Sequence, residues 1–170
     1  MSEGDAGPPI PPDVLDRLRR SVPLRMTAQG RLVLGGEDVT HPRVIAALRA
    51  GLDVTEAGEP TVSLGPHWIY LTVDDCPLRA LAVRSAGDGT LWMRLDDGRA
   101  VPLDPASLWE EPGRGLRSRA ASQPSGRALA VRFTNPALMD LAEHLDDDGV
   151  LIVGGVCYEI GSSDPATSSA

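Results

Sequence analysis

The residues best suited to bind a ligand in this sequence are arginines within a segment rich in glycine, proline and serine. Arg114, Arg117 and Arg119 fall within residues 110–127, where apolar residues show no regular spacing. A guanidinium group binds a carboxylate or a phosphate through two parallel hydrogen bonds. The composition predicts a long loop. This loop is either an anion-binding patch or a flexible, solvated linker, and we take the three arginines as binding candidates.

Two aromatic residues form a second set of binding candidates. Trp68 and Tyr70 are two positions apart in a segment rich in aromatic and β-branched residues, 68–73. Such a segment predicts a strand, on which both side chains share one face. That face is either part of the core or an exposed binding platform. Because aromatic residues make up only 4% of the chain, the core is the favoured interpretation.

Acidic residues and histidines show no catalytic or metal-binding spacing. Asp74 and Asp75 are adjacent, so on a strand they point to opposite faces, and a turn is the favoured interpretation. Residues 146–150 resemble the start of a calcium loop but lack its alternation of acidic positions. The histidines occur without an HxH or HExxH spacing: His41, His67 and His144. We therefore predict no metal site.

Residue types also exclude several classes of enzyme. All 16 basic residues are arginines, so there is no lysine to act as a Schiff-base nucleophile, phosphate-loop residue or general base. The sequence contains no GxSxG or GxGxxG motif. Cys76 and Cys157 fit no metal-binding spacing, and we expect two reduced thiols. We predict no cofactor and no catalytic residue, and a non-enzymatic role is favoured.

The composition indicates a soluble protein with an acidic surface. The chain has 170 residues, 42% of them hydrophobic, and no apolar run approaches the ~18 residues of a membrane-spanning helix. The first residues lack a basic start and an apolar stretch, so we expect a cytoplasmic protein. A net charge of −8 argues against nucleic acid and membrane surfaces as partners. We expect a protein or a small anionic ligand instead; the oligomeric state stays open.

Two polar tails, at residues 1–12 and 161–170, flank the expected ordered body. The body divides into an N-terminal α+β half, residues 13–79, and a β-rich C-terminal half, residues 80–160. The fold class is therefore α+β, with antiparallel hairpins and meanders and a short helix in each half. Expected helices lie within 13–22, 40–52 and 134–145; expected strands lie within 24–34, 61–73, 78–103, 128–133 and 151–160.

One short pattern occurs twice in the chain. Thr40-His41-Pro42 and Thr134-Asn135-Pro136 each begin a helical pattern, and a hairpin follows both. This order predicts that the two β-rich halves are similar and arose by internal duplication. The alternative is two unrelated helices that begin with the same capping chemistry.

The order of these segments resembles a known bacterial family. Residues 73–78, Val-Asp-Asp-Cys-Pro-Leu, are similar to the Val-Glu-Asp-x-Pro-Phe hallmark of the family catalogued as domain of unknown function 1285. The resemblance covers residues 24–160. It implies an α+β fold with two similar β-rich halves and no established activity, for which signalling is the usual suggestion. It supplies no catalytic residue.

These features favour a non-catalytic binding or regulatory module of the signalling type. The alternative is a small-molecule-binding protein or a weak enzyme, with its site in the groove between the two halves.

Overall fold

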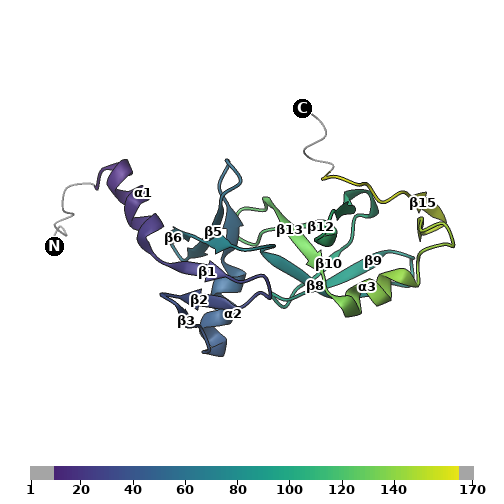
Figure 1. Ribbon diagram of the computed structural model, residues 1–170, viewed down its shortest axis with the longest axis horizontal. Coiled ribbons are helices and arrows are strands. Elements are labelled where there is room, and N and C mark those ends of the chain that lie inside the picture. The colour runs from purple at the N-terminus through teal and green to yellow at the C-terminus, as the bar shows by residue number, and fades with distance from the viewer. Residues whose placement is uncertain (1–9, 165–170) are drawn as a thin grey trace, which may run out of the picture.

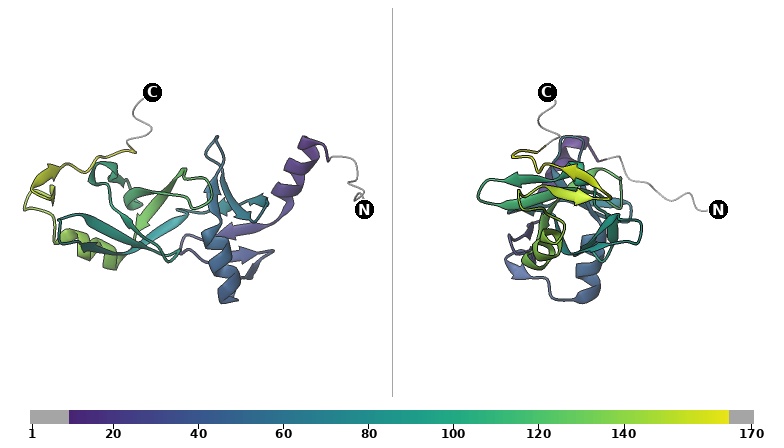
Figure 2. Two further views of the ribbon diagram at one scale, coloured as in Figure 1. Left: turned by 180° about the vertical axis from the view of Figure 1, so that it is seen from behind. Right: turned by 90° about the vertical axis from the view of Figure 1, so that its right-hand side faces the viewer.

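The computed structural model describes residues 10–164, which form an elongated α+β fold (Figure 1). We call residues 10–77 the N-terminal part and residues 78–164 the C-terminal part. The N-terminal part contains two helices and two small sheets; the C-terminal part contains one helix, a six-stranded sheet and a terminal hairpin. The two parts follow each other along the long axis (Figure 2). None of the described helices is long and apolar enough to cross a membrane.

The first sheet of the N-terminal part is built around a tight hairpin of β1 and β2. Strand β1 (Leu24–Met26) pairs antiparallel with β2 (Leu32–Leu34), which pairs with β3 (Glu37–Asp38). Strand β7 (Thr72–Val73) returns later in the chain and pairs parallel with β1. The turn between β1 and β2 contains Gly30 with a φ of 82°, a left-handed conformation that favours glycine.

The second sheet follows helix α2 (Pro42–Ala50). It is antiparallel, in the order β4 (Leu52–Val54), β5 (Pro60–Leu64) and β6 (His67–Tyr70). Helix α1 (Pro12–Ser21) packs against β6 at the far end of the molecule (Figure 1).

The six-stranded sheet dominates the C-terminal part, and β8 lies near its centre. β8 pairs antiparallel with β9 and parallel with β13, in the order β10-β9-β8-β13-β12-β11. The bounds are β8 (Leu78–Ser85), β9 (Leu91–Leu95), β10 (Ala100–Pro102), β11 (Trp109–Glu111), β12 (Gly115–Ala121) and β13 (Ala128–Phe133). A short 3-10 helix, Pro105–Ser107, connects β10 to β11.

The prediction of a long loop over residues 110–127 is wrong. Strands β11 and β12 occupy most of this segment, and β12 pairs with β13 over residues 117–121. Ser118 and Ala120 of β12 are 0% and 8% exposed. Because these buried residues are small or polar, their alternation gives almost no hydrophobic signal in the sequence.

Helix α3 (Asn135–Ala142) packs along β8 beyond the point where β13 ends and hydrogen-bonds to it. β13 pairs with β8 only over residues 78–80. Farther along β8, the Val83 N–H donates to the Asp140 carboxylate of α3 at 2.9 Å, so the carboxylate replaces a strand carbonyl. This hydrogen bond and the Arg84 guanidinium lower the pKa of Asp140.

After hairpin β14 (Leu151–Val153) and β15 (Val156–Tyr158), the chain runs back along β11. The Glu110 N–H donates to the Gly161 carbonyl at 2.7 Å, and Asp164 pairs with Arg119 at 2.5 Å. The tail predicted from residue 161 is therefore wrong for residues 161–164, because these residues dock on the sheet. The rest of that predicted tail, residues 165–170, and residues 1–9 of the predicted N-terminal tail lie outside the described residues.

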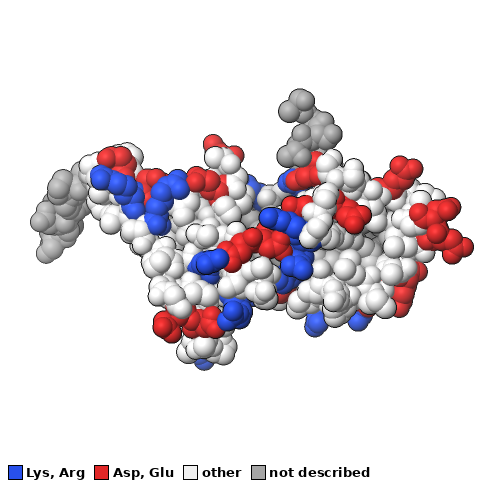
Figure 3. Space-filling view, viewed as in Figure 1, with Lys and Arg blue, Asp and Glu red and all other residues white. Residues whose placement is uncertain are grey.

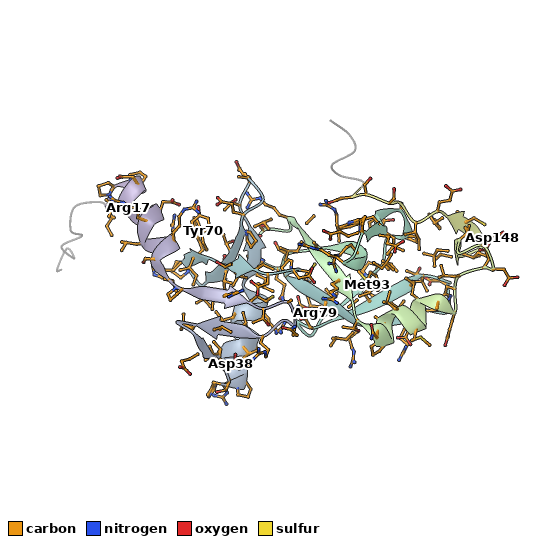
Figure 4. All side chains as sticks on the ribbon, viewed as in Figure 1. Arg17, Asp38, Tyr70, Arg79, Met93 and Asp148 are labelled. Carbon is orange, nitrogen blue, oxygen red and sulfur yellow. The ribbon has the colours of Figure 1, made fainter. Side chains whose placement is uncertain are left out.

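One continuous cluster of buried apolar side chains runs through both parts. It includes Met26 and Val62 from the N-terminal part and Met93 and Val131 from the C-terminal part, all fully buried. Met93 is the central residue of β9, which lies between β10 and β8 in the six-stranded sheet (Figure 4). The fold class predicted from the sequence, α+β, is confirmed, and the internal duplication stays a prediction.

Buried charges join the two parts at Arg79 (Figure 4). Arg79 of β8 donates to the Ala28 carbonyl in the β1–β2 turn at 2.6 Å. Asp96 accepts from Arg49 of α2 at 2.5 Å and from the Arg79 backbone N–H at 3.0 Å. A Cβ atom at Gly30 would lie 2.1 Å from Arg79 Nη1, so only glycine leaves room for this guanidinium.

We predict that Asp96→Asn destabilises the chain by about 3–5 kcal/mol, because it leaves two buried guanidinium groups without their carboxylate. The side chains of Arg79 and Arg49 are only 8% and 16% exposed. The matched control is Asp38→Asn, which breaks an exposed pair with Arg31 and costs less than about 1 kcal/mol. Urea unfolding measures both; equal losses in the two variants would refute the role of Asp96.

Candidate functional site

A cavity of about 490 Å³ opens where the β11–β12 turn, the start of α3 and the segment before β8 meet. Both parts contribute to it, since Ala28 belongs to the β1–β2 turn. We call it the junction groove. Its lining residues are Ala28, Asp74, Asp75, Gly113, Arg114, Gly115, Leu116, Arg132, Phe133, Asn135 and Leu138.

Ion pairs fix the floor of the junction groove around Asp75. The Asp75 carboxylate accepts from Arg117 Nη2 at 2.6 Å and from Arg132 Nη1 at 2.9 Å. Arg117 also donates from Nε to Glu111 at 3.0 Å, and its side chain is only 2% exposed. The neighbouring Asp74 pairs with Arg25 of β1 at 2.7 Å. Both groove carboxylates are thus already engaged by arginines.

Two arginines line the groove while remaining open to solvent. Arg114 is 58% exposed, and its ion pair with Glu111 is long, at 3.7 Å. Arg132 is 42% exposed and uses Nη1 for Asp75. The exposed pair of Arg114 with Glu111 is weak, and Arg132 has further donors besides Nη1, so both guanidinium groups can bind an incoming anion.

The first turn of α3 adds a positive end to the same groove. Thr134 is the N-cap, but its side chain donates to the Ala80 carbonyl at 2.9 Å and makes no capping bond. Asn135 is exposed and lines the groove. Because a helix start carries a partial positive charge, it favours an anion.

A second cavity of about 630 Å³ adjoins the junction groove and shares Gly115, Leu116 and Leu138 with it. Its rim is acidic, because Glu110, Asp148 and Glu159 line it. Asp148 lies at the far C-terminal end of the molecule, where acidic side chains gather (Figures 3 and 4). The two cavities therefore share the apolar side chains of Leu116 and Leu138, with the arginines in the junction groove and the acidic rim in the second cavity.

The three arginine candidates have different environments. Arg114 lines the groove, as an anion-binding residue must. Arg117 is buried in the ion pairs with Asp75 and Glu111, and Arg119 pairs with Asp164 and lies 5.7 Å from the Trp109 ring centroid. The interpretation of all three as solvated loop residues is wrong, because β12 turns Arg117 toward the carboxylates.

The aromatic candidates share one face, as predicted, but they are not in the junction groove. Their rings lie 5.1 Å apart in an edge-on arrangement, and α1 covers them. The Arg19 guanidinium lies 3.9 Å from the Trp68 ring centroid, and that of Arg20 lies 3.7 Å from the Tyr70 centroid. Tyr70 also donates to Asp16 at 2.9 Å. These residues hold α1 in place, so they form neither an open platform nor a fully buried core.

Two residues of the groove, Arg132 and Asp75, were not predicted from the sequence as site residues. Arg132 lies in a strand recognised from its apolar residues, and the arginine between Val131 and Phe133 is the outward position of that alternation. Asp75 was interpreted as part of a turn. The strand alternation is the signal that identifies Arg132 as an outward residue, but no local pattern pairs it with Asp75.

Cys76 lies next to the groove but is not available as a nucleophile. The side chain is buried, and this burial raises the pKa of its thiol to about 12. Cys157 is exposed on β15. Within residues 10–164, no three His, Cys, Asp or Glu side chains are grouped as metal ligands require.

We predict that a thiol reagent such as DTNB labels one cysteine in the native protein and both after denaturation. The slow residue is Cys76, since burial suppresses both its thiolate and the approach of the reagent. Cys157→Ser removes the native reaction, whereas Cys76→Ser leaves it unchanged. Rapid labelling of two thiols in the native state would contradict the burial of Cys76.

Comparison with known proteins identifies the fold. No protein-family profile and no curated sequence matches the chain. A DUF1285 family protein from Silicibacter pomeroyi DSS-3 has a similar structure, with a TM-score of 0.65 and 16% identity over 95% of this chain and 90% of that one. A DUF1285 family protein from Shewanella baltica OS155 gives a TM-score of 0.59 and 14% identity over 74% of this chain and 94% of that one. The chain therefore has the fold of these DUF1285 proteins, as the resemblance of residues 73–78 implied.

Proposed function

We propose that the chain is a non-catalytic binding module that holds a small anionic molecule in the junction groove. The observation that carries the proposal is the placement of Arg114, Arg132 and the uncapped start of α3 around one cavity. A cavity of about 490 Å³ has the size of an ordinary small-molecule site.

The charges of the groove support an anion rather than a cation. Asp74 and Asp75 are each paired with an arginine, so an added cation would have to displace a guanidinium. An added anion meets Arg114, whose present partner is 3.7 Å away. A carboxylate or phosphate at this position gains a bidentate contact and the end of α3.

The side chains of the groove support binding rather than catalysis. The lining contains no serine, threonine, cysteine, histidine or tyrosine, so it offers no ordinary nucleophile. Its carboxylates are engaged in ion pairs and are poorly placed to accept a proton from a substrate.

The position of the groove between the two parts supports a regulatory role. Ala28 and Asp74 come from the N-terminal part, whereas Arg114 and Asn135 come from the C-terminal part. A ligand that contacts both favours one relative placement of the parts over others, and this is how a signalling module reports binding.

We predict that at least one member of a panel of phosphate- and carboxylate-bearing metabolites raises the melting temperature of the protein. Arg114→Gln should weaken binding of that compound about tenfold, the equivalent of one partly exposed charged contact. Calorimetric titration gives the dissociation constants. Arg132→Gln should act similarly, with some loss of stability because Asp75 keeps only Arg117 as a partner.

The matched control is Arg43→Gln, since Arg43 is an exposed arginine of α2 outside the junction groove and forms no ion pair with any residue in the described range 10–164. The affinity of the Arg43→Gln variant for the selected compound should equal that of the wild type. If no compound in the panel binds, or if Arg43→Gln weakens binding as much as Arg114→Gln, the groove is not the anion site.

A further inference from the structure

We propose that Trp92, Arg84 and Arg94, on the outer face of the β8–β9–β10 meander, form a docking surface for an acidic segment of another protein. This surface is separate from the junction groove, whose lining includes none of the three residues.

The strand registers bring the three side chains to one face. Leu91, Met93 and Leu95 of β9 are buried, so Trp92 and Arg94 point outward. Arg84 is directly opposite Trp92 on the neighbouring strand β8. Directly opposite residues of an antiparallel pair share a face, so Trp92 has an arginine beside it on both its own strand and the next.

Trp92 differs from the other aromatic residues of the chain. It is 39% exposed, whereas Trp109 and Phe133 are 5% and 3% exposed. The other two tryptophans each have a guanidinium near the ring, at 3.9 Å for Trp68 and 5.7 Å for Trp109. Within residues 10–164, Trp92 is the tryptophan without such a cover. Its apolar surface is thus left for a partner.

The arginines on either side of Trp92 are also available. Arg94 is exposed and forms no ion pair or side-chain hydrogen bond with another of the described residues. Arg84 pairs with Asp140 of α3 at 2.7 Å, but its side chain remains 72% exposed. Asp140 neutralises one guanidinium at most, so the surface keeps a positive charge on an otherwise acidic molecule.

The residue types on this face favour a macromolecule over a small ligand. Trp92 and Arg94 are flanked across the strands by small or short side chains: Ala82, Ala100 and Pro102. An exposed tryptophan with adjacent arginines has the composition of a protein-binding hot spot. Charge complementarity requires carboxylates on the partner, and the indole requires an apolar side chain between them.

Two other occupants fit the charges less well. In a symmetric pairing with a second copy, the same patch meets itself, so two surfaces of like charge are brought together. A nucleic acid would bring many phosphates close to a chain of net charge −8. A short segment with a few carboxylates avoids both penalties.

Selection of random short peptides displayed on phage against the full chain tests the proposal. The counter-selection uses Trp92→Thr, because threonine keeps the strand preference but removes the ring. We expect enriched peptides that combine Asp or Glu with a large apolar residue. Synthetic copies should lose affinity about tenfold or more for Trp92→Thr and for Arg94→Glu, measured by fluorescence anisotropy. Arg43→Glu, the same charge change on α2, should leave the affinity unchanged.

Unchanged melting temperatures of the three variants exclude a folding defect as the cause of any loss. The proposal is overturned if no selected peptide depends on Trp92 for binding. It is also overturned if Arg43→Glu loses as much peptide affinity as Arg94→Glu. Dimers in sedimentation that dissociate in Trp92→Thr would assign the face to a second copy instead. Binding of a single-stranded oligonucleotide lost in both Trp92→Thr and Arg94→Glu would assign it to nucleic acid, and either result would also overturn the proposal. The Arg114→Gln variant, which tests the junction groove, should bind these peptides as the wild type does, so the two proposals are tested independently.

Discussion

Burial of arginine side chains against carboxylates is the interaction on which the arrangement of the two parts depends. Asp96 joins Arg79 of the sheet to Arg49 of α2, and Asp75 of the N-terminal part pairs with the buried Arg117 of β12. Such pairs add little net stability compared with apolar contacts, but a mismatched pair is strongly penalised. They therefore select one relative placement of the parts among those that the apolar core alone would allow.

The same arginine–carboxylate pairs tie the junction groove to the packing of the two parts. Asp75 lines the groove and also holds the buried Arg117, so the groove's floor and the packing of β12 are set together. A guanidinium has several donors in one plane, and Arg132 can retain Asp75 while offering its remaining donors to a ligand. A lysine at this position would have a single charged nitrogen for both tasks. The chain, which has no lysine, uses arginine at every such position.

The parts of the fold with strong apolar alternation or clear turn residues are predictable from the sequence, and the rest are not. The β1–β2 hairpin around Gly30 and the strand containing Leu129, Val131 and Phe133 follow from local patterns. Strand β12 does not, because Ser118 and Ala120 are too small to mark a buried face. Of the groove, Arg114 was identified by residue type. The pairing of Asp75 with Arg117 spans 42 positions, and no local periodicity encodes it.

The return of residues 161–164 along β11 has a consequence for the sheet as a whole. β11 is the last strand in the order, and a bare outer strand exposes a row of unpaired N–H and C=O groups to any other extended chain. The Glu110 N–H is satisfied by Gly161, and Trp109 forms a parallel bridge with the same residue. Residues 161–164 thus cover part of this edge of the sheet, which leaves fewer backbone groups free for another extended chain to pair with.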